Sequence, residues 1–132
     1  MNSCQTVPTL HAQSAHLPKR VLCVDESSDI LEICSAFLHS AGYQVGTFKN
    51  GKAAIEYLRA NTADAVIIDD TLSDMSGRDL ARIVKGISKS IVVVMYSSRL
   101  GSEENIPWLD SYLSKGRGPS ALRTLLDTLM KA

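Results

Sequence analysis

The sequence predicts an α/β fold built on a doubly wound, five-stranded parallel sheet. Short apolar segments alternate with stretches of helical periodicity along the chain. The middle segments are continuous apolar runs, as expected for strands whose two faces are both covered by helices. The 132 residues, 45% of them apolar, suffice for one packed domain. Together these observations favour parallel strands joined by helical crossovers.

The five predicted strands are short and mostly apolar. They are residues 20–24, 43–48, 64–69, 91–96 and 111–114. The fourth is rich in β-branched residues, which favour strands, and the fifth has the weakest apolar pattern. The third contains Val66, Ile67 and Ile68, a run typical of a buried strand.

The first two helices follow the first two strands. Ser27 or Ser28 is a candidate N-cap for the first, and Gly42 is its C-terminal stop. Asn50 and Gly51 open the second. The apolar positions are Ile30, Ile33, Phe37 and Leu38 in the first helix, and Ala54, Ile55 and Leu58 in the second.

Two further helices are predicted, and one connection is ambiguous. A helix over residues 77–87 carries Leu80, Ile83 and Val84 on one side. Residues 101–109 contain Pro107, which ends or kinks a helix, so the fourth helix is expected to be abbreviated or irregular. Pro119 fits the first turn of the last helix. The apolar face of that helix consists of Leu122, Leu125, Leu126 and Leu129.

Composition and charge exclude several classes of protein. Residues 1–18 are polar and aperiodic, and we expect a flexible N-terminal tail there. No apolar stretch reaches the roughly 18 residues of a membrane span, and the N-terminus lacks the apolar core of a secretory signal. The formal net charge of zero argues against direct binding of nucleic acid, which requires a basic surface.

The three cysteines predict neither a disulfide framework nor a zinc site. Cys4, Cys23 and Cys34 are few and irregularly spaced, without a CxxC motif or a His–Cys cluster. Cys23 lies in an apolar run and Cys34 on an apolar helix face, so both are interpreted as small buried hydrophobes. A reducing, cytoplasmic location fits this usage best.

Acidic residues end two of the predicted strands. In VIIDDTLSDMSG, residues 66–77, the apolar run stops at Asp69 and Asp70, with a third acid four residues later. Asp25 and Glu26 end the first strand in the same way. In a flavodoxin-like strand order, 2-1-3-4-5, these two strands are neighbours, and such folds bind ligands at the C-terminal ends of their strands. The topology therefore brings three or four carboxylates to one edge.

Such a cluster points to a cation and to phosphoryl chemistry. Neighbouring carboxylates repel one another unless protons or a cation neutralise them, and Mg²⁺ suits a few carboxylates with water and phosphate oxygens. One carboxylate could then attack a phosphoryl group. Lys115 ends the fifth strand, and Ser97 and Ser98 follow the fourth. Each residue alone is more often a turn former, a helix cap or a solvated side chain, but their joint placement favours a site.

Four segments together resemble the receiver domain of two-component response regulators, over residues 19–131. They are VLCVDE (21–26), AGYQVGTFKNGKAAIEYL (41–58), IIDDTLSDMSG (67–77) and SYLSK (111–115). The resemblance implies a receiver domain over residues 19–132. It also implies a phosphoacceptor aspartate eight residues before Gly77, which is Asp69.

The resemblance further implies the other site residues. Asp25, Glu26 and Asp69, with the backbone carbonyl of Thr71, would bind Mg²⁺. Lys115 would contact the phosphoryl group. Ser97, with Ser98 as second choice, would be the switch hydroxyl, and Tyr112 the aromatic switch residue.

The implied partners are a sensor histidine kinase or phosphotransfer protein, which donates the phosphoryl group, and a downstream protein target. The target would bind the face of the fourth helix, fifth strand and fifth helix, which includes Leu109, Tyr112 and residues 117–120. Such a module is a signalling domain that catalyses only its own phosphorylation and dephosphorylation. The sequence leaves open whether the domain stands alone or is a piece of a longer chain.

Several alternatives remain at this point. Ser73 and Gly116 stand where the family usually has prolines, and the fourth segment is short, which slightly favours a degenerate receiver that acts as a phosphorylation-independent binding scaffold. The retained Asp25, Glu26, Asp69 and Lys115 oppose that alternative. IIDDTL also suggests an aspartate-based phosphatase of the haloacid dehalogenase kind, but Thr71 occupies the position of its second acid. A nucleotide-binding Rossmann domain is disfavoured because DESSD, not a glycine-rich turn, follows the first strand.

Overall fold

The centre of the fold is one sheet of five parallel strands. The computed structural model describes residues 17–99 and 106–131. The strands are β1 (Arg20–Val24), β2 (Gln44–Phe48), β3 (Ala65–Ile68), β4 (Val92–Ser97) and β5 (Ser111–Ser114). Their order is β2-β1-β3-β4-β5, and each neighbouring pair is parallel. The predicted flavodoxin-like order is therefore confirmed.

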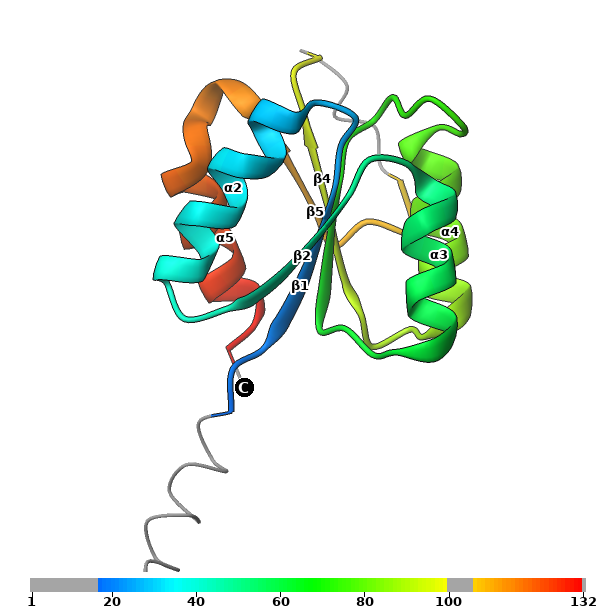
Figure 1. Cartoon of the computed structure of the whole chain (residues 1–132), viewed down its shortest axis with the longest axis horizontal. Helices are drawn as coiled ribbons and strands as arrows, with labels where there is room; N and C mark the ends of the chain where they lie inside the picture. The colour runs from blue at the N-terminus through cyan, green and yellow to red at the C-terminus, as the bar shows by residue number, and fades with distance from the viewer. Residues whose placement is uncertain (1–16, 100–105, 132) are drawn as a thin grey trace, which may run out of the picture.

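Helices cover both faces of this sheet. α2 (Ser28–Ser40) and α5 (Gly118–Leu129) lie on one face, and α3 (Gly51–Ala60) and α4 (Gly77–Ile87) lie on the other, as Figure 1 shows. The doubly wound α/β class is confirmed by this three-layer arrangement.

Alternate residues of each strand serve different layers of the core. In β1, Val21 and Cys23 pack toward α2 and α5, whereas Leu22 and Val24 pack toward α3 and α4. All four are at most 3% exposed. Burial on both faces explains why the central strands are continuous apolar runs.

Side-chain caps fix where three of the helices begin. Ser27 accepts a hydrogen bond from the Ile30 N–H of α2. Asn50 caps α3, and Ser76 caps α4, each by accepting a bond from the N–H three residues on. These caps satisfy backbone donors that the first helical turn leaves without partners. The residues that leave the strands are therefore held in defined positions.

The buried face of α2 differs from the predicted one. Leu31, Cys34 and Leu38 are buried, whereas Ile33 is 46% and Phe37 39% exposed. Apolar residues occupy more of the circumference of this helix than the sheet and α5 can cover. Apolar spacing alone therefore could not separate the buried stripe from its apolar neighbours.

The two cysteines that the sequence predicts to be buried, Cys23 and Cys34, are free thiols in the core. Cys23 and Cys34 are 3% exposed and belong to the cluster beneath α2. Burial raises the pKa of the Cys34 thiol to about 11 and that of Cys23 further. Both behave as small hydrophobes, as predicted.

The described part of the connection between β4 and β5, in which the sequence predicts an abbreviated or irregular fourth helix, contains a turn. Within residues 106–110, Leu109 N donates to the Ile106 carbonyl, and Trp108 packs against the α3–α4 side of the core. Most of residues 101–109, and most of the tail predicted over 1–18, lie outside the described residues. No helix in the described ranges is long and apolar enough to cross a membrane.

Two aspartates make polar contacts at the edge of the sheet where the strands begin. Arg20 N donates to Asp64 Oδ2 at 2.8 Å. Lys85 Nζ lies 2.8 Å from Asp110 Oδ2 and also donates to the Ile91 carbonyl at 2.7 Å. The same Asp110 oxygen accepts from Val93 N at 2.7 Å. The entrances to β4 and β5 are thereby tied to the end of α4.

Candidate functional site

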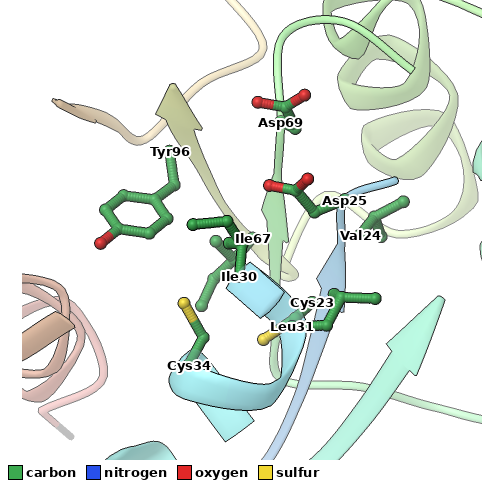
Figure 2. Close-up of a pocket in the computed structure, with 9 residues that line it drawn as sticks. All are labelled: Cys23, Val24, Asp25, Ile30, Leu31, Cys34, Ile67, Asp69 and Tyr96. Atoms are coloured by element: carbon green, nitrogen blue, oxygen red, sulfur yellow. The ribbon is translucent and has the colours of Figure 1, made fainter. Parts of the chain in front are cut away.

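Asp25 and Asp69 lie side by side where β1 and β3 end. Asp69 N donates to the Val24 carbonyl at 2.9 Å, and Asp25 N donates to the Phe48 carbonyl at 3.0 Å, so the sheet ladder extends to both residues. Asp25 is 5% and Asp69 9% exposed. Figure 2 shows both carboxylates at one end of a hollow whose remaining lining is apolar apart from the two thiols and Tyr96. The backbone hydrogen bonds of the sheet therefore fix the positions of both aspartates.

Lys115 bridges the two carboxylates. Its Nζ lies 2.6 Å from Asp25 Oδ2 and 2.9 Å from Asp69 Oδ1. Lys115 follows β5 and starts a short 3₁₀ turn, η1 (Lys115–Arg117), in which Gly116 N donates to Ser114 Oγ at 3.1 Å. The turn with Gly116 thus directs the lysine into the site.

The site holds more negative than positive charge. Burial raises the pKa of Asp69, and the charges of Asp25 and Asp70 add to this, although the hydrogen bond from Lys115 opposes it. Burial lowers the pKa of Lys115, but its hydrogen bonds to both aspartates outweigh burial and raise that pKa overall. Lys115 is therefore a fixed cation, and Asp69 is a carboxylate whose ionised form is disfavoured.

Arg99 links the predicted switch residues, and sequence reasoning missed it. Ser97, the fully buried last residue of β4, accepts a hydrogen bond from Arg99 N at 3.1 Å. The Tyr112 hydroxyl donates to the Arg99 carbonyl. The Arg99 guanidinium lies 3.4 Å from Asp70 Oδ2. Ser98 is exposed beyond the strand. No sequence motif marks Arg99, because two of its three contacts use the backbone.

The loop from Asp70 to Ser76 leads from the acids into α4. Thr71 and Ser76 form an isolated antiparallel bridge, and Gly77 N donates to the Asp70 carbonyl at 2.9 Å. A Cβ on Gly77 would lie 2.2 Å from the Asp69 carbonyl oxygen. Glycine is therefore required for the chain to return this close to the phosphoacceptor candidate.

The oxygen donors present suit a hard cation. Asp25 and Asp69 supply two buried carboxylates that approach the same lysine nitrogen, and carboxylate oxygens are ligands of the type Mg²⁺ prefers. Within the described ranges, no group of three or more His, Cys, Asp or Glu side chains is gathered for a metal. Glu26 is exposed and does not join the pair of aspartates. The structure thus brings together Asp25, Asp69 and Lys115, with Ser97 and Thr71 at the same edge.

The fold and the site define a flavodoxin-like α/β domain with an acidic site at the C-terminal edge of its sheet. Residues 21–127 match the model of the response regulator receiver domain. The chain belongs to this family, the receiver domains of two-component signalling, so the resemblance seen in its motifs is confirmed.

Curated relatives include the response regulator SaeR of Staphylococcus epidermidis, which is 29% identical over 106 residues, covering 77% of this chain and 46% of the relative. SaeR of Staphylococcus aureus is 27% identical over 114 residues, covering 83% of this chain and 50% of the relative. The chain thus spans about half the length of the curated relatives it matches.

Solved structures share the fold at low identity. A CheY-like receiver domain protein from Methanospirillum hungatei has a TM-score of 0.78 at 22% identity, covering 85% of this chain and 93% of that one. TrrA from Thermotoga maritima, solved in complex with Mg²⁺–BeF, has a TM-score of 0.78 at 24% identity, covering 85% and 99%. These likenesses support the fold assignment.

Proposed function

We propose that this domain is a phosphorylation switch in which Asp69 accepts a phosphoryl group. The observation that carries the proposal is the bridge by Lys115, which lies within 2.9 Å of carboxylates from two separate strands. A scaffold that only binds other proteins has no need of two buried acids around one lysine, since buried charges are costly.

Asp25, Glu26 and Asp69, with the Thr71 carbonyl, would hold Mg²⁺. Asp25 and Asp69 supply the buried pair of carboxylates. Glu26 is exposed, so its contribution would pass through one of the waters that Mg²⁺ usually retains. The ion would screen the repulsion between an anionic nucleophile and an anionic phosphoryl group.

Asp69 would act as the nucleophile in the transfer. One of its carboxylate oxygens forms a bond to phosphorus while the phosphorus–nitrogen bond of a partner's phosphohistidine breaks, and the imidazole nitrogen keeps the electron pair. Lys115 already holds Asp69 Oδ1 and would move with its charge to the new phosphoryl oxygens. The product is an acyl phosphate on Asp69.

Ser97 and Tyr112 would transmit the change. The Ser97 hydroxyl, now bonded to Arg99 N, would turn to the phosphoryl oxygens, and this would free the Arg99 backbone to move. Tyr112 would respond because its hydroxyl bonds the Arg99 carbonyl. The result is a remodelled face around Leu109, Tyr112 and residues 117–120, where a downstream protein would bind.

The partners are proposed on the same basis. A sensor histidine kinase or a phosphotransfer protein would supply the phosphoryl group, in the cytoplasm. The domain would catalyse only its own phosphorylation and dephosphorylation and so act as a signalling module.

An intact-mass experiment tests the proposal. The protein is incubated with Mg²⁺ and acetyl phosphate, and we expect one phosphate adduct that Asp69→Asn abolishes. An adduct that survives in Asp69→Asn but is lost in Asp70→Asn would move the phosphoacceptor by one residue. A folded wild-type protein without an adduct would instead support the phosphorylation-independent scaffold.

A further inference from the structure

We propose that Asp74 is a positioning residue of the phosphoryl-transfer site, because it ties the loop that carries Thr71 to the N-terminus of α3. This inference rests on the proposed function. Asp74 is the third acid of the segment 66–77, and neither the bridge by Lys115 nor the proposed metal set uses it.

The carboxylate of Asp74 accepts hydrogen bonds from two backbone amides at the start of α3. Its Oδ1 accepts from Gly51 N at 2.9 Å, and its Oδ2 accepts from Lys52 N at 2.9 Å. These are first-turn amides of α3, where backbone donors lack helical partners and the helix dipole favours negative charge. The two hydrogen bonds lower the pKa of Asp74 below its ordinary range, so its carboxylate is ionised at neutral pH. We call this carboxylate with its two amide partners, Gly51 N and Lys52 N, the clamp.

A second contact beside the carboxylate fixes the same two segments. The Met75 side chain lies directly over Gly51, and a Cβ at residue 51 would meet Met75 Sδ at 2.5 Å. Gly51 is buried. The loop over residues 70–76 and the start of α3 are therefore joined by the hydrogen bonds of Asp74 and by the packing of Met75 on Gly51.

The clamp acts on the part of the loop that the site needs. Between Asp69 and Gly77, the loop is closed internally by the Thr71–Ser76 bridge and by two backbone hydrogen bonds, from Leu72 N to the Met75 carbonyl and from Gly77 N to the Asp70 carbonyl. Leu72 is buried in the core, but Thr71, Ser73 and Asp74 on either side of it are exposed, so burial does not hold these three residues directly. An anchor at Asp74 removes conformational freedom from this loop, and the position of the Thr71 carbonyl depends on that loop.

Three variants separate loop positioning from simple capping of α3. Asp74→Ala removes the clamp. Asp79→Ala is the matched control, since it removes an exposed acid of α4 whose ion-pair partner, Arg82, is also more than half exposed. The double variant Ser73→Pro/Asp74→Ala stiffens the loop without restoring the cap, and among the described contacts the Ser73 N–H has no acceptor to lose.

Two readouts are taken on each protein without any phosphodonor. Titration with MgCl₂, followed by NMR, gives the dissociation constant, and amide hydrogen exchange reports the order of residues 70–76 and of Gly51 and Lys52. In Asp74→Ala we expect Mg²⁺ binding to weaken about tenfold, as for the loss of a group that supports a metal ligand. Exchange should accelerate in both segments, and Asp79→Ala should match wild type.

The double variant decides the mechanism. We expect it to recover most of the Mg²⁺ affinity and loop protection, while Gly51 and Lys52 continue to exchange fast. Equal Mg²⁺ affinity in wild type and Asp74→Ala overturns the proposal, as does a double variant that recovers nothing. A wild-type protein that binds Mg²⁺ but forms no phosphate adduct would refute phosphoryl transfer alone, and the clamp would then be judged on metal affinity.

Discussion

Charged side chains are paired differently at the two edges of the sheet, the one where the strands begin and the one where they end. Where the strands begin, charged groups have dedicated partners: Lys85 meets Asp110, and Asp64 receives the Arg20 amide. Where the strands end, Asp25 and Asp69 share Lys115, while Asp70 contacts the exposed Arg99 and the Thr71 hydroxyl. The pKa of Asp69 is raised at this second edge, first by burial and also by its acidic neighbours.

This difference separates charged groups that stabilise the fold from charged groups whose crowding destabilises it. At the starting edge each contact satisfies a backbone or side-chain partner, so removing one should destabilise the protein. At the C-terminal edge the acids crowd together at a cost, which the surrounding core must offset. Substitutions at the two edges should therefore change stability in opposite directions when they remove an acid.

The largest effect is expected from Gly77→Ala, which tests how tightly the C-terminal edge is built. The new methyl group would collide with the Asp69 carbonyl and the Asp70 Cα, both backbone atoms that cannot step aside. We expect a loss of about 3 kcal/mol in the free energy of unfolding, measured by urea denaturation. Gly86→Ala, where a Cβ meets nothing within 4 Å, is the control and should be neutral or stabilising.

Asp110→Ala should weaken the starting edge by about 2 kcal/mol, because the buried Val93 amide would lose its side-chain acceptor and Lys85 would lose its carboxylate partner. Asp110→Asn keeps an oxygen for the Val93 amide and should lose about half as much. Urea denaturation measures both values. A neutral Asp110→Ala would remove the distinction between the edges.

Lys115→Met should destabilise the protein by about 1–2 kcal/mol at pH 7, because Asp25 and Asp69 would repel each other without their shared cation. The hydrogen bond from Lys115 lowers the pKa of Asp69, so losing the lysine raises the folded pKa of Asp69, and a raised carboxyl pKa costs stability above that pKa and not below it. The deficit should therefore shrink as the pH falls toward about 4. A deficit that does not change with pH would assign the effect to lost packing.

Asp69→Asn should give the smallest change and the opposite sign. Its raised pKa means that the ionised carboxylate disfavours the folded state at neutral pH, so the neutral amide should raise the melting temperature at pH 7. The gain should disappear once the pH falls below the ordinary pKa of a carboxyl group. A lower melting temperature at pH 7 would show that the bond to Lys115 outweighs burial and repulsion.

Much of the fold could be predicted because its signals are local. Apolar runs located the strands of the sheet, and Ser27, Asn50 and Gly77 marked helix starts within a residue. The buried stripe of α2 could not be predicted in the same way. Which apolar side chains of a broad stripe are covered depends on the angle at which the helix packs, and this is a tertiary property.

The candidate site was predictable only as far as topology reaches. Asp25, Asp69, Ser97 and Lys115 share one edge because parallel strands end together. The outward position of Glu26 and the backbone contacts of Arg99 and Asp74 depend on loop geometry. No residue type or spacing encodes these features, so the sequence predicted the acidic edge of the sheet and not the loops that complete it.

The turn before β5 gives the molecule a built-in optical probe. Trp108 is the one tryptophan of the chain, and it is half-buried against the α3–α4 side of the core, four residues before Tyr112. Its emission colour depends on how much water reaches the indole ring. Any rearrangement of this turn can therefore be followed by intrinsic fluorescence in real time, without a dye and without altering a single atom of the protein.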